Sequence, residues 1–140
     1  MDKDDKSRLL KSLFESDDSM NEINKITEII IGSAYKIANT LGCGFLEKVY
    51  ENALAYEIRK HNLEVKQQES IKVYYEGFEV GFYEADLWIE NKVLVELKAV
   101  KNLDEVHRAQ CLNYLKATKV KICLLINFGN PKVEIKRIAL

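Results

Sequence analysis

The stretch EADLWIENKVLVELK, residues 84–98, decides the fold of this chain. Two apolar segments with the alternation of β-strands flank Glu90-Asn91-Lys92, which is typical of a tight turn. Asp86, Glu96 and Lys98 interrupt the apolar pattern. Because side chains alternate along a strand, Glu96 and Lys98 share one face. A turn of three residues places Asp86 opposite Glu96 on that face, whereas a two-residue turn requires a bulge or bend to do so.

These three residues have two interpretations, because charged side chains inside a sheet are costly unless they are paired or bound to a metal ion. The first is an ion pair of Lys98 with Glu96 or Asp86 at the sheet margin. The second is a site that cleaves phosphodiesters. In it, two carboxylates bind Mg²⁺, the metal supplies an activated water, and the lysine contacts that water and the phosphate. The spacing of Asp, about ten residues and then Glu-x-Lys fits the second interpretation, but these residues alone do not exclude the first.

Outward from this hairpin, the periodicity predicts elements in the order α-α-β-β-β-α-β-β. Helices are expected at residues 19–41, 45–61 and 104–118, and strands at residues 64–75, 78–89, 92–100, 120–127 and 132–138. The first helix opens on the capping box Ser19-Met-Asn-Glu22 and ends at Gly42. Residues 1–18 are expected to form a charged lead-in with a short helix around Ser7–Phe14. We expect one α/β domain over residues 19–140, a mixed sheet flanked by helices on both faces.

The composition is that of a globular protein, with 47% hydrophobic and 31% charged residues among 140. No apolar run approaches the roughly 20 residues that a membrane span needs. The opening residues MDKDDKSR lack the hydrophobic segment of a secretory signal. Cys43, Cys111 and Cys123 form neither a CxxC pair for zinc nor a disulfide framework. We therefore expect a cytoplasmic protein in which all three cysteines are small buried apolar residues.

The charges are unevenly distributed, although the net charge is only −1. Residues 98–140 hold nine Lys or Arg and three acidic residues, so they carry +6 and residues 1–97 carry −7. A basic C-terminal part could face phosphates while the acidic part holds a metal ion. The alternative is ordinary solvated surface, which the charge distribution alone favours.

Further motifs lie on both sides of the hairpin. Gly44-Phe-Leu-Glu47-Lys-Val-Tyr50 precedes it, and His107-Arg-Ala-Gln110-Cys-Leu-Asn-Tyr114 follows it, before LLINFG and IKRIAL. Together these motifs resemble the GxxExxY proteins of the PD-(D/E)XK nuclease superfamily, from about Ile23 to Leu140. The resemblance implies a restriction-endonuclease-like core in the order α-β-β-β-α-β, which agrees with the predicted order of elements.

The resemblance also implies roles for the residues around the hairpin. Asp86 and Glu96 would be the metal carboxylates, with the carbonyl of Leu97 as a third ligand. Lys98 would orient or activate the water. Glu47 would be the additional acidic residue that many members place near the metal. The proline of the superfamily motif is absent, since an alanine precedes Asp86, at a position that varies among members.

The third predicted helix carries a second group of candidates. Gln110 and Tyr114 resemble the QxxxY element of RecB-type nucleases, which supports the site and contacts substrate. His107 lies on the same helical face as Gln110 and Tyr114. His107 and Lys101 are further candidates for binding substrate, although a capping or surface role is the ordinary one for a single histidine. The apolar stripe of this helix is predicted to face elsewhere and consists of Val106, Ala109, Leu112 and Leu115.

The second predicted helix carries two acidic residues on one face, Glu47 and Glu51. Neighbouring charges favour a solvated surface for Glu51, and only Glu47 belongs to the GxxExxY motif, so Glu47 is the predicted functional residue. Tyr50 is predicted to pack in the core with its hydroxyl hydrogen bonded. Leu46 and Val49 are expected on the inward face of the helix.

The sequence thus predicts Mg²⁺- or Mn²⁺-dependent hydrolysis of a nucleic-acid phosphodiester, with DNA as the expected substrate. Many nucleases cut both strands as dimers, so a homodimer is one arrangement to test. The alternative function is a catalytically silent module that keeps the nuclease fold and binds nucleic acid or protein. A third interpretation is a structural ion-pair cluster. It predicts a fold unchanged by metal and destabilised by neutralising Asp86 or Glu96.

Overall fold

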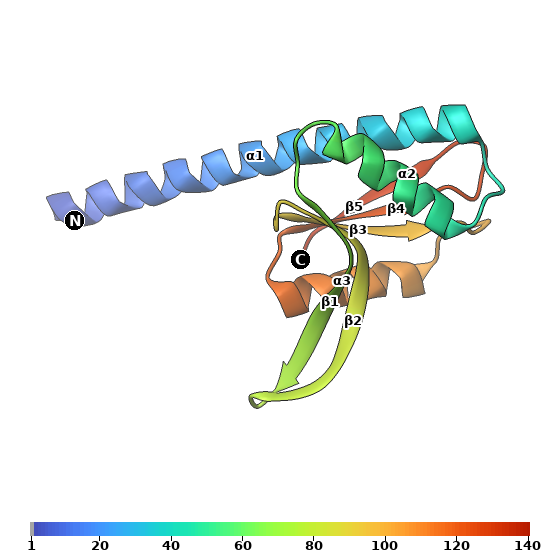
Figure 1. The fold of residues 1–140 in the computed structure, drawn as a ribbon. Helices are drawn as coiled ribbons and strands as arrows, with labels where there is room; N and C mark the ends of the chain where they lie inside the picture. Colours follow the sequence, from blue (N-terminus) through green and yellow to red (C-terminus); the bar gives the residue numbers. More distant parts are fainter. Residues whose placement is uncertain (1) are drawn as a thin grey trace.

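The computed structural model describes residues 2–140, and of residues 14–17 it describes the backbone alone. Its centre is a five-stranded mixed sheet in the order β1-β2-β3-β4-β5 (Figure 1). The strands are β1 Val65–Tyr75, β2 Phe78–Ile89, β3 Val93–Lys98, β4 Ile122–Asn127 and β5 Glu134–Ile138. The parallel pair is β3 and β4, and the other neighbours are antiparallel. Helix α3, Glu105–Thr118, makes the crossover that a parallel pair requires. The predicted α/β fold is confirmed.

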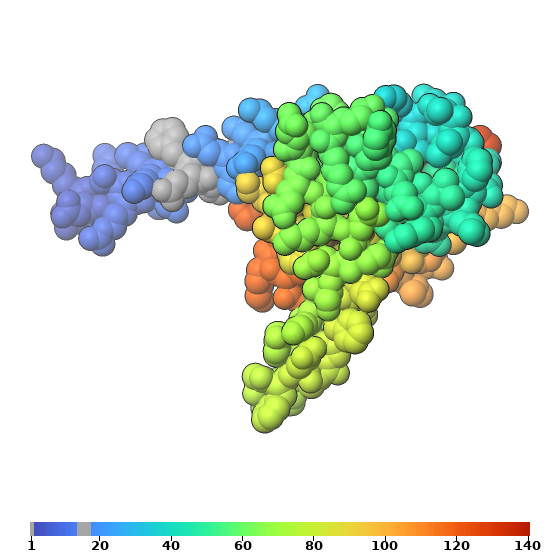
Figure 2. Space-filling view, viewed as in Figure 1, coloured from blue at the N-terminus to red at the C-terminus, as the bar shows by residue number. Residues whose placement is uncertain are grey.

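Helices cover both faces of this sheet. Figure 1 shows α1, Lys3–Leu41, and α2, Glu47–Arg59, on one side and α3 on the other. Alternate residues of β3 serve the two layers: Val95 and Leu97 pack with α1 and α2, whereas Leu94 packs with α3. Every residue of β4 is buried, as the continuous apolar run predicted. The β1–β2 hairpin continues beyond the layers as an arm that projects from the body (Figure 2).

The first helix begins much earlier than the capping box at Ser19 predicted. Helix α1 starts at Lys3, and the Asp2 side chain accepts a hydrogen bond from the Asp4 amide at 3.3 Å. No glycine or proline lies between Lys3 and Ile31, so nothing in the sequence interrupts the helix before Ser19. A capping pattern inside a run of helix-compatible residues is therefore not a helix start. The other end is as predicted, because Gly42 caps the helix with φ 70°.

The other two helices also differ from prediction in the residues that they bury. Leu46 and Val49 are exposed, because α2 begins only at Glu47 and its inward face starts at Tyr50. In α3, Val106 and Ala109 are exposed, and the buried residues are Cys111, Tyr114 and Leu115. The expected separation into an apolar and a polar stripe is thus wrong: one inward face is polar at the N-terminal end and apolar at the C-terminal end. Cys43 is exposed, whereas Cys111 and Cys123 are buried as expected.

The turn between β2 and β3 has the three-residue length that places the acidic residues together. Ile89 pairs with Val93 and Leu87 with Val95, and the Lys92 amide donates to the Ile89 carbonyl at 2.9 Å. Pairing ends there, so Asp86 and Glu96 are the next residues beyond the last pair of this register. The structure therefore confirms the three-residue turn from which the sequence analysis placed Asp86 near Glu96. Within residues 2–140, no helix combines the length and apolar composition needed to cross a bilayer.

A buried asparagine at the end of β4 fixes the chain just after β3. The Asn127 Oδ1 accepts hydrogen bonds from the amides of Val100, at 3.0 Å, and Gly129, at 2.9 Å, while its Nδ2 donates to the Val100 carbonyl at 2.8 Å. The Phe128 amide donates to the Lys98 carbonyl at 2.8 Å. A Cβ atom at Gly129 would lie 2.0 Å from the Val100 carbonyl oxygen. The end of β3 that carries Lys98 is therefore held by a contact that admits only glycine.

We predict that Gly129→Ala lowers the free energy of unfolding by about 2 kcal/mol or more, because the added methyl group overlaps backbone atoms that cannot move freely. Gly32→Ala is the matched control. A Cβ at Gly32 meets nothing within 4 Å, and alanine is the better helix former, so stability should hold or rise. Urea unfolding of both variants measures the difference. Equal stabilities of the two variants would contradict the proposed close approach.

Candidate active site

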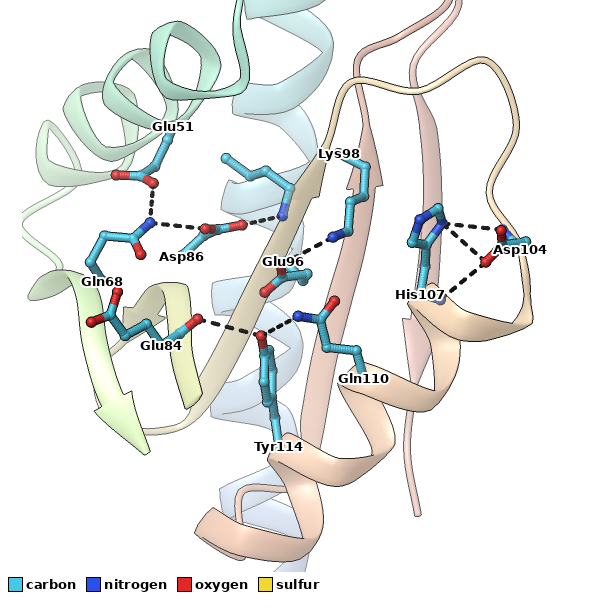
Figure 3. Close-up of polar contacts among 11 residues, drawn as sticks. Glu51, Gln68, Glu84, Asp86, Glu96, Lys98, Asp104, His107, Gln110 and Tyr114 are labelled. Atoms are coloured by element: carbon cyan, nitrogen blue, oxygen red, sulfur yellow. Dashed lines mark hydrogen bonds and ion pairs between the residues drawn. The ribbon is translucent and has the colours of Figure 1, made fainter. Parts of the chain in front are cut away.

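Asp86 lies where the pairing of β2 and β3 ends, and its carboxylate takes the place of the next backbone partner. Its Oδ2 accepts the Leu97 amide at 2.7 Å and its Oδ1 accepts the Gln68 side chain at 2.9 Å (Figure 3). Burial raises the pKa of Asp86, while these two hydrogen bonds act in the opposite direction. The carboxylate is thus held at a fixed position in a partly desolvated site.

Leu97 presents backbone atoms rather than its side chain to this site. Its side chain is buried on the face covered by α1 and α2. Within a strand, the N–H and C=O of one residue point toward the same neighbouring strand. Because the Leu97 amide reaches Asp86, its carbonyl is directed to the same side. This orientation agrees with the predicted role of the carbonyl as a ligand, which stays a prediction.

Glu96 lies in an electrostatically unfavourable environment for a carboxylate. It is 5% exposed, and among the described residues its Oε2 atom has no hydrogen-bond partner. Burial, followed by the negative charge of Asp86, raises the pKa of Glu96 to about 8, although Lys98 partly counteracts both. A buried carboxylate oxygen without a partner is uncommon and needs an explanation such as an ion.

Lys98 lies on the same face as Glu96, as the alternation predicted. Its Nζ atom is 3.7 Å from Glu96 Oε1, which is the contact that the ion-pair interpretation expects. This contact involves Oε1 of Glu96, so Oε2 stays without a partner among the described residues. In the structure, Lys98 does not form an ion pair with Asp86. The lysine side chain is mostly buried, with its ammonium beside the carboxylates (Figure 3). An ion pair with Lys98 therefore does not satisfy the acidic pair by itself.

The donor atoms at this position fit a small hard cation. No cluster of three or more His, Cys, Asp or Glu side chains suited to a metal is found in the part of the chain that the structure describes. Mg²⁺ does not require one, because it commonly uses one or two carboxylates and keeps several waters. Asp86 and Glu96 supply the carboxylates, and the free oxygen of Glu96 is the buried atom that such an ion would satisfy.

A third carboxylate approaches from α2, and it belongs to Glu51 rather than to Glu47. Glu51 is 3% exposed, so its expected place on a solvated surface is wrong. Its Oε1 accepts the Gln68 side chain at 2.5 Å and its Oε2 accepts Gln67 at 2.7 Å and Lys48 at 2.8 Å. Glu47 lies one turn earlier on the same helix and is exposed. Helix α2 thus brings Glu51 inward and leaves Glu47 at the rim.

Gln68 joins the two acidic residues, and no sequence pattern indicated this residue. Its Nε2 donates both to Glu51 and to Asp86 (Figure 3). Gln68 has φ 52°, a left-handed conformation that costs energy for a residue with a side chain. Its neighbours Gln67 and Glu69 still pair with β2, so the irregularity is confined to the residue facing Asp86. A local backbone distortion therefore aims this amide at the site.

Helix α3 borders the site from the other side. The Gln110 side chain donates to the Tyr114 hydroxyl at 2.7 Å, and that hydroxyl lies 3.4 Å from the Glu84 carbonyl (Figure 3). Tyr114 is only 1% exposed, and burial together with the charge of Glu96 raises its pKa. Tyr114 therefore lies beneath Glu96, and its expected role in supporting the site stays a prediction. Its expected contact with substrate stays a prediction.

The remaining predicted residues are placed at the margin. His107 Nδ1 accepts the Asp104 amide at 3.2 Å, and Asp104 accepts the amides of Val106 and His107, so His107 completes the capping box of α3. Lys101 is exposed in the loop between β3 and α3. Roles of His107 and Lys101 in binding substrate stay predictions.

The comparison with protein families decides the superfamily. The family model of the PD-(D/E)XK nuclease superfamily matches residues 24–138, which include the hairpin and both flanking helices. The chain belongs to the PD-(D/E)XK nuclease superfamily. A restriction-endonuclease-like α/β fold, with a five-stranded mixed sheet and flanking helices, is what the structure shows.

Other comparisons add little to this assignment. No curated protein matches the sequence significantly. The solved structure described as "Crystal structure of SSO0001" is similar with a TM-score of 0.49 and 15% sequence identity. The match covers 86% of this chain and 60% of that one.

We predict that Glu96→Gln makes stability less dependent on pH in the absence of metal. The raised pKa means that folded Glu96 keeps a proton which the unfolded chain releases between its ordinary pKa of 4.5 and about 8. The contribution of this proton to the free energy of unfolding is therefore fully present below about pH 4.5 and is lost as the pH rises toward about 8. In EDTA at about pH 9, the variant should be more stable than the wild type by a few kcal/mol.

Urea unfolding between about pH 5 and pH 9 measures this effect. Glu28→Gln, which removes an exposed carboxylate on α1, is the control and should follow the wild type. Parallel profiles for wild type and Glu96→Gln would show that Glu96 is not held in the unfavourable environment described above.

Proposed function

We propose that this domain hydrolyses phosphodiester bonds of DNA with Mg²⁺ or Mn²⁺. The observation that carries the proposal is the buried carboxylate pair of Asp86 and Glu96, in which Glu96 keeps one oxygen without a partner beside Lys98. Membership of the superfamily supports metal-dependent nuclease chemistry and binding of nucleic acid. DNA as the substrate, the identity of the ion and the activity itself are parts of the proposal.

In this proposal the protein's own groups have separate tasks. Asp86 and Glu96 would hold the ion together with the carbonyl of Leu97, and Lys98 would orient the attacking water and contact the phosphate. The ion, when bound, supplies the acidity that activates this water and the charge that stabilises the reacting phosphate. Gln110 and Tyr114 would support Glu96 from beneath, since Gln110 donates to the Tyr114 hydroxyl and Tyr114 is buried beside Glu96. Gln68 would hold Asp86 in place, since a fixed carboxylate keeps the donor atoms in one geometry.

We also propose that the chain is a GxxExxY protein within the superfamily. The motif residues Gly44, Glu47 and Tyr50 surround the start of α2. The Tyr50 hydroxyl donates to the Gly42 carbonyl at 2.6 Å and accepts the Phe45 amide at 3.2 Å, and its ring stacks on Phe128. The motif residues thus hold the turn that leads into α2. This structural role supports the assignment of the chain to the GxxExxY proteins. Tyr50 packs as the sequence predicted.

We predict that Asp86→Asn, Glu96→Gln and Lys98→Ala each reduce Mn²⁺-dependent cleavage of DNA by at least about 100-fold, because each removes a group that acts on the reacting phosphate or its metal. Gel assays with single-stranded and double-stranded substrates measure the rate. Glu28→Gln and Lys25→Ala on α1 remove comparable charges at positions far in sequence from Asp86, Glu96 and Lys98. Both variants should retain the wild-type rate.

Calorimetry with Mn²⁺ separates the nuclease from the silent binding module. The nuclease proposal expects binding that Glu96→Gln weakens. Cleavage that survives all three substitutions would overturn the mechanism. DNA binding without cleavage, combined with no Glu96-dependent Mn²⁺ binding, would instead assign the silent module.

We predict different results for the two acidic residues of α2. Glu51→Gln should weaken Mn²⁺ binding or cleavage by roughly 10- to 100-fold, because Glu51 is buried and connected to Asp86 through Gln68. Glu47→Gln should have the smaller effect, since Glu47 is exposed at the rim. The two substitutions are chemically identical, so each is the control for the other. A larger loss from Glu47→Gln would restore the role that the motif predicted for Glu47.

A further inference from the structure

A groove of about 520 Å³ runs between the β1–β2 hairpin and the C-terminal half of α3, outside the carboxylate site. Its polar and aromatic lining consists of Lys72, Tyr74, Tyr83, Asn113, Lys116 and Lys119. Three lysines are among its lining residues, whereas no acidic residue in the part of the chain that the structure describes lines it. The groove therefore concentrates positive charge in a protein whose net charge is −1.

Two tyrosines of this lining are exposed to solvent. Tyr74 is 60% exposed and Tyr83 is 41% exposed. The pairing of β1 with β2 changes register between Val73 and Tyr74, where Val80 of β2 is the additional residue and bends its strand. Exposed aromatic faces beside lysines are the combination that binds unpaired bases and their phosphates.

One aromatic contact connects the lining of the groove with the carboxylate site. The rings of Tyr83 and Tyr114 meet edge to face with centroids 5.6 Å apart. Tyr114 lies beneath Glu96, and its neutral side chain places no charge between the groove and the carboxylates. A chain lying in the groove would therefore approach the carboxylates from the hairpin side.

We propose that this groove binds a single-stranded DNA segment next to the bond that is cut, an inference that rests on the proposed function for the identity of that bond. A hollow of this volume accepts a ligand of small-molecule size, which corresponds to one or two nucleotides and not to a duplex. Tyr74 and Tyr83 can stack only on bases that are not already paired and stacked in a helix. Lys72, Lys116 and Lys119 neutralise the phosphates.

The charges around the groove favour DNA over a second copy of the chain. In a symmetric contact centred on the groove, the three lysines of one copy would face those of the other, which is unfavourable. The exposed apolar residues Phe78 and Val80 lie on the hairpin near Glu76 and Glu79, and Glu79 pairs with Tyr74 in the register of β1 and β2. Because acidic residues repel phosphates, the proposed phosphate contacts lie at the lysines of the groove and not at the tip of the hairpin.

Fluorescence anisotropy with a labelled oligothymidine tests the proposal, using Glu96→Gln protein in EDTA so that no cleavage occurs. The double variant Lys116→Ala/Lys119→Ala should bind about tenfold more weakly. For this variant, the slope of log affinity against log salt concentration should be smaller in magnitude by about 1.4, because each phosphate contact with a single strand contributes about 0.7. Tyr74→Ala should weaken binding by roughly 5- to 100-fold, and Tyr74→Phe, which keeps the ring, should bind normally.

Matched controls remove the same side chains elsewhere. Lys25→Ala on α1 and Tyr56→Ala on α2 both change exposed residues and should bind like the parent. Circular dichroism confirms the fold of each variant, and if Tyr74→Ala unfolds, the lysine variant and its salt dependence decide the question. A blunt duplex should show the smaller loss in both groove variants.

Unchanged affinity and salt dependence in the lysine variant would overturn the proposal. So would equal weakening by Tyr74→Ala and Tyr74→Phe, or equal losses for the single strand and the duplex. A dimer that Tyr74→Ala dissociates, seen by sedimentation, would assign the groove to a second copy. Groove-dependent binding without Mn²⁺-dependent cleavage would reject the nuclease function alone, whereas cleavage with binding unaffected by the groove variants would reject the groove alone.

Discussion

The hydrogen bond from the Leu97 amide to the Asp86 carboxylate is the interaction on which the arrangement of the site depends. Backbone pairing between β2 and β3 stops at Leu87 and Val95. The next amide of β3 that faces β2 belongs to Leu97, and a side chain satisfies it instead of a carbonyl. Beyond this point β2 turns away into the arm that it forms with β1 (Figure 1). The carboxylate thus ends the ladder and occupies the opening between the two strands.

This opening explains why the acidic residues can be so close to one another. Asp86, Glu96 and Glu51 come from three different elements, and the two strand carboxylates both have raised pKa values because of burial. Amide donors and Lys48 satisfy Glu51, and Gln68 is shared between Glu51 and Asp86. Of these three residues, Glu96 alone keeps a buried oxygen without a partner among the described residues. The unsatisfied Oε2 atom of Glu96 therefore lowers the stability of the fold. Such a cost is typical of positions kept for function and not for folding.

The sequence was sufficient for the hairpin because every step there is local. The turn length sets the register, and the register sets which of Asp86, Glu96 and Lys98 share a face. Glu51 and Gln68 could not be found in the same way. Their importance depends on how α2 lies against β1, and on a left-handed residue that no pattern of side chains indicates. The GxxExxY motif directed attention to Glu47, although the helical repeat places Glu51 on the same face one turn closer to the core.

Sequence patterns were also insufficient for α3, because this one helix borders the carboxylate site and also covers the apolar face of the sheet. Periodicity predicted an apolar stripe separate from His107, Gln110 and Tyr114, but Val106 and Ala109 of that stripe are exposed, and the inward face of α3 combines polar and apolar residues. Its N-terminal half borders carboxylates and is polar, with His107 used to cap the helix. Its C-terminal half covers the apolar strands through Cys111 and Leu115. Tyr114 lies between the two halves, with its ring among apolar residues and its hydroxyl toward Glu96. A single helix can thus anchor the sheet and complete the acidic site only because the tyrosine satisfies both environments.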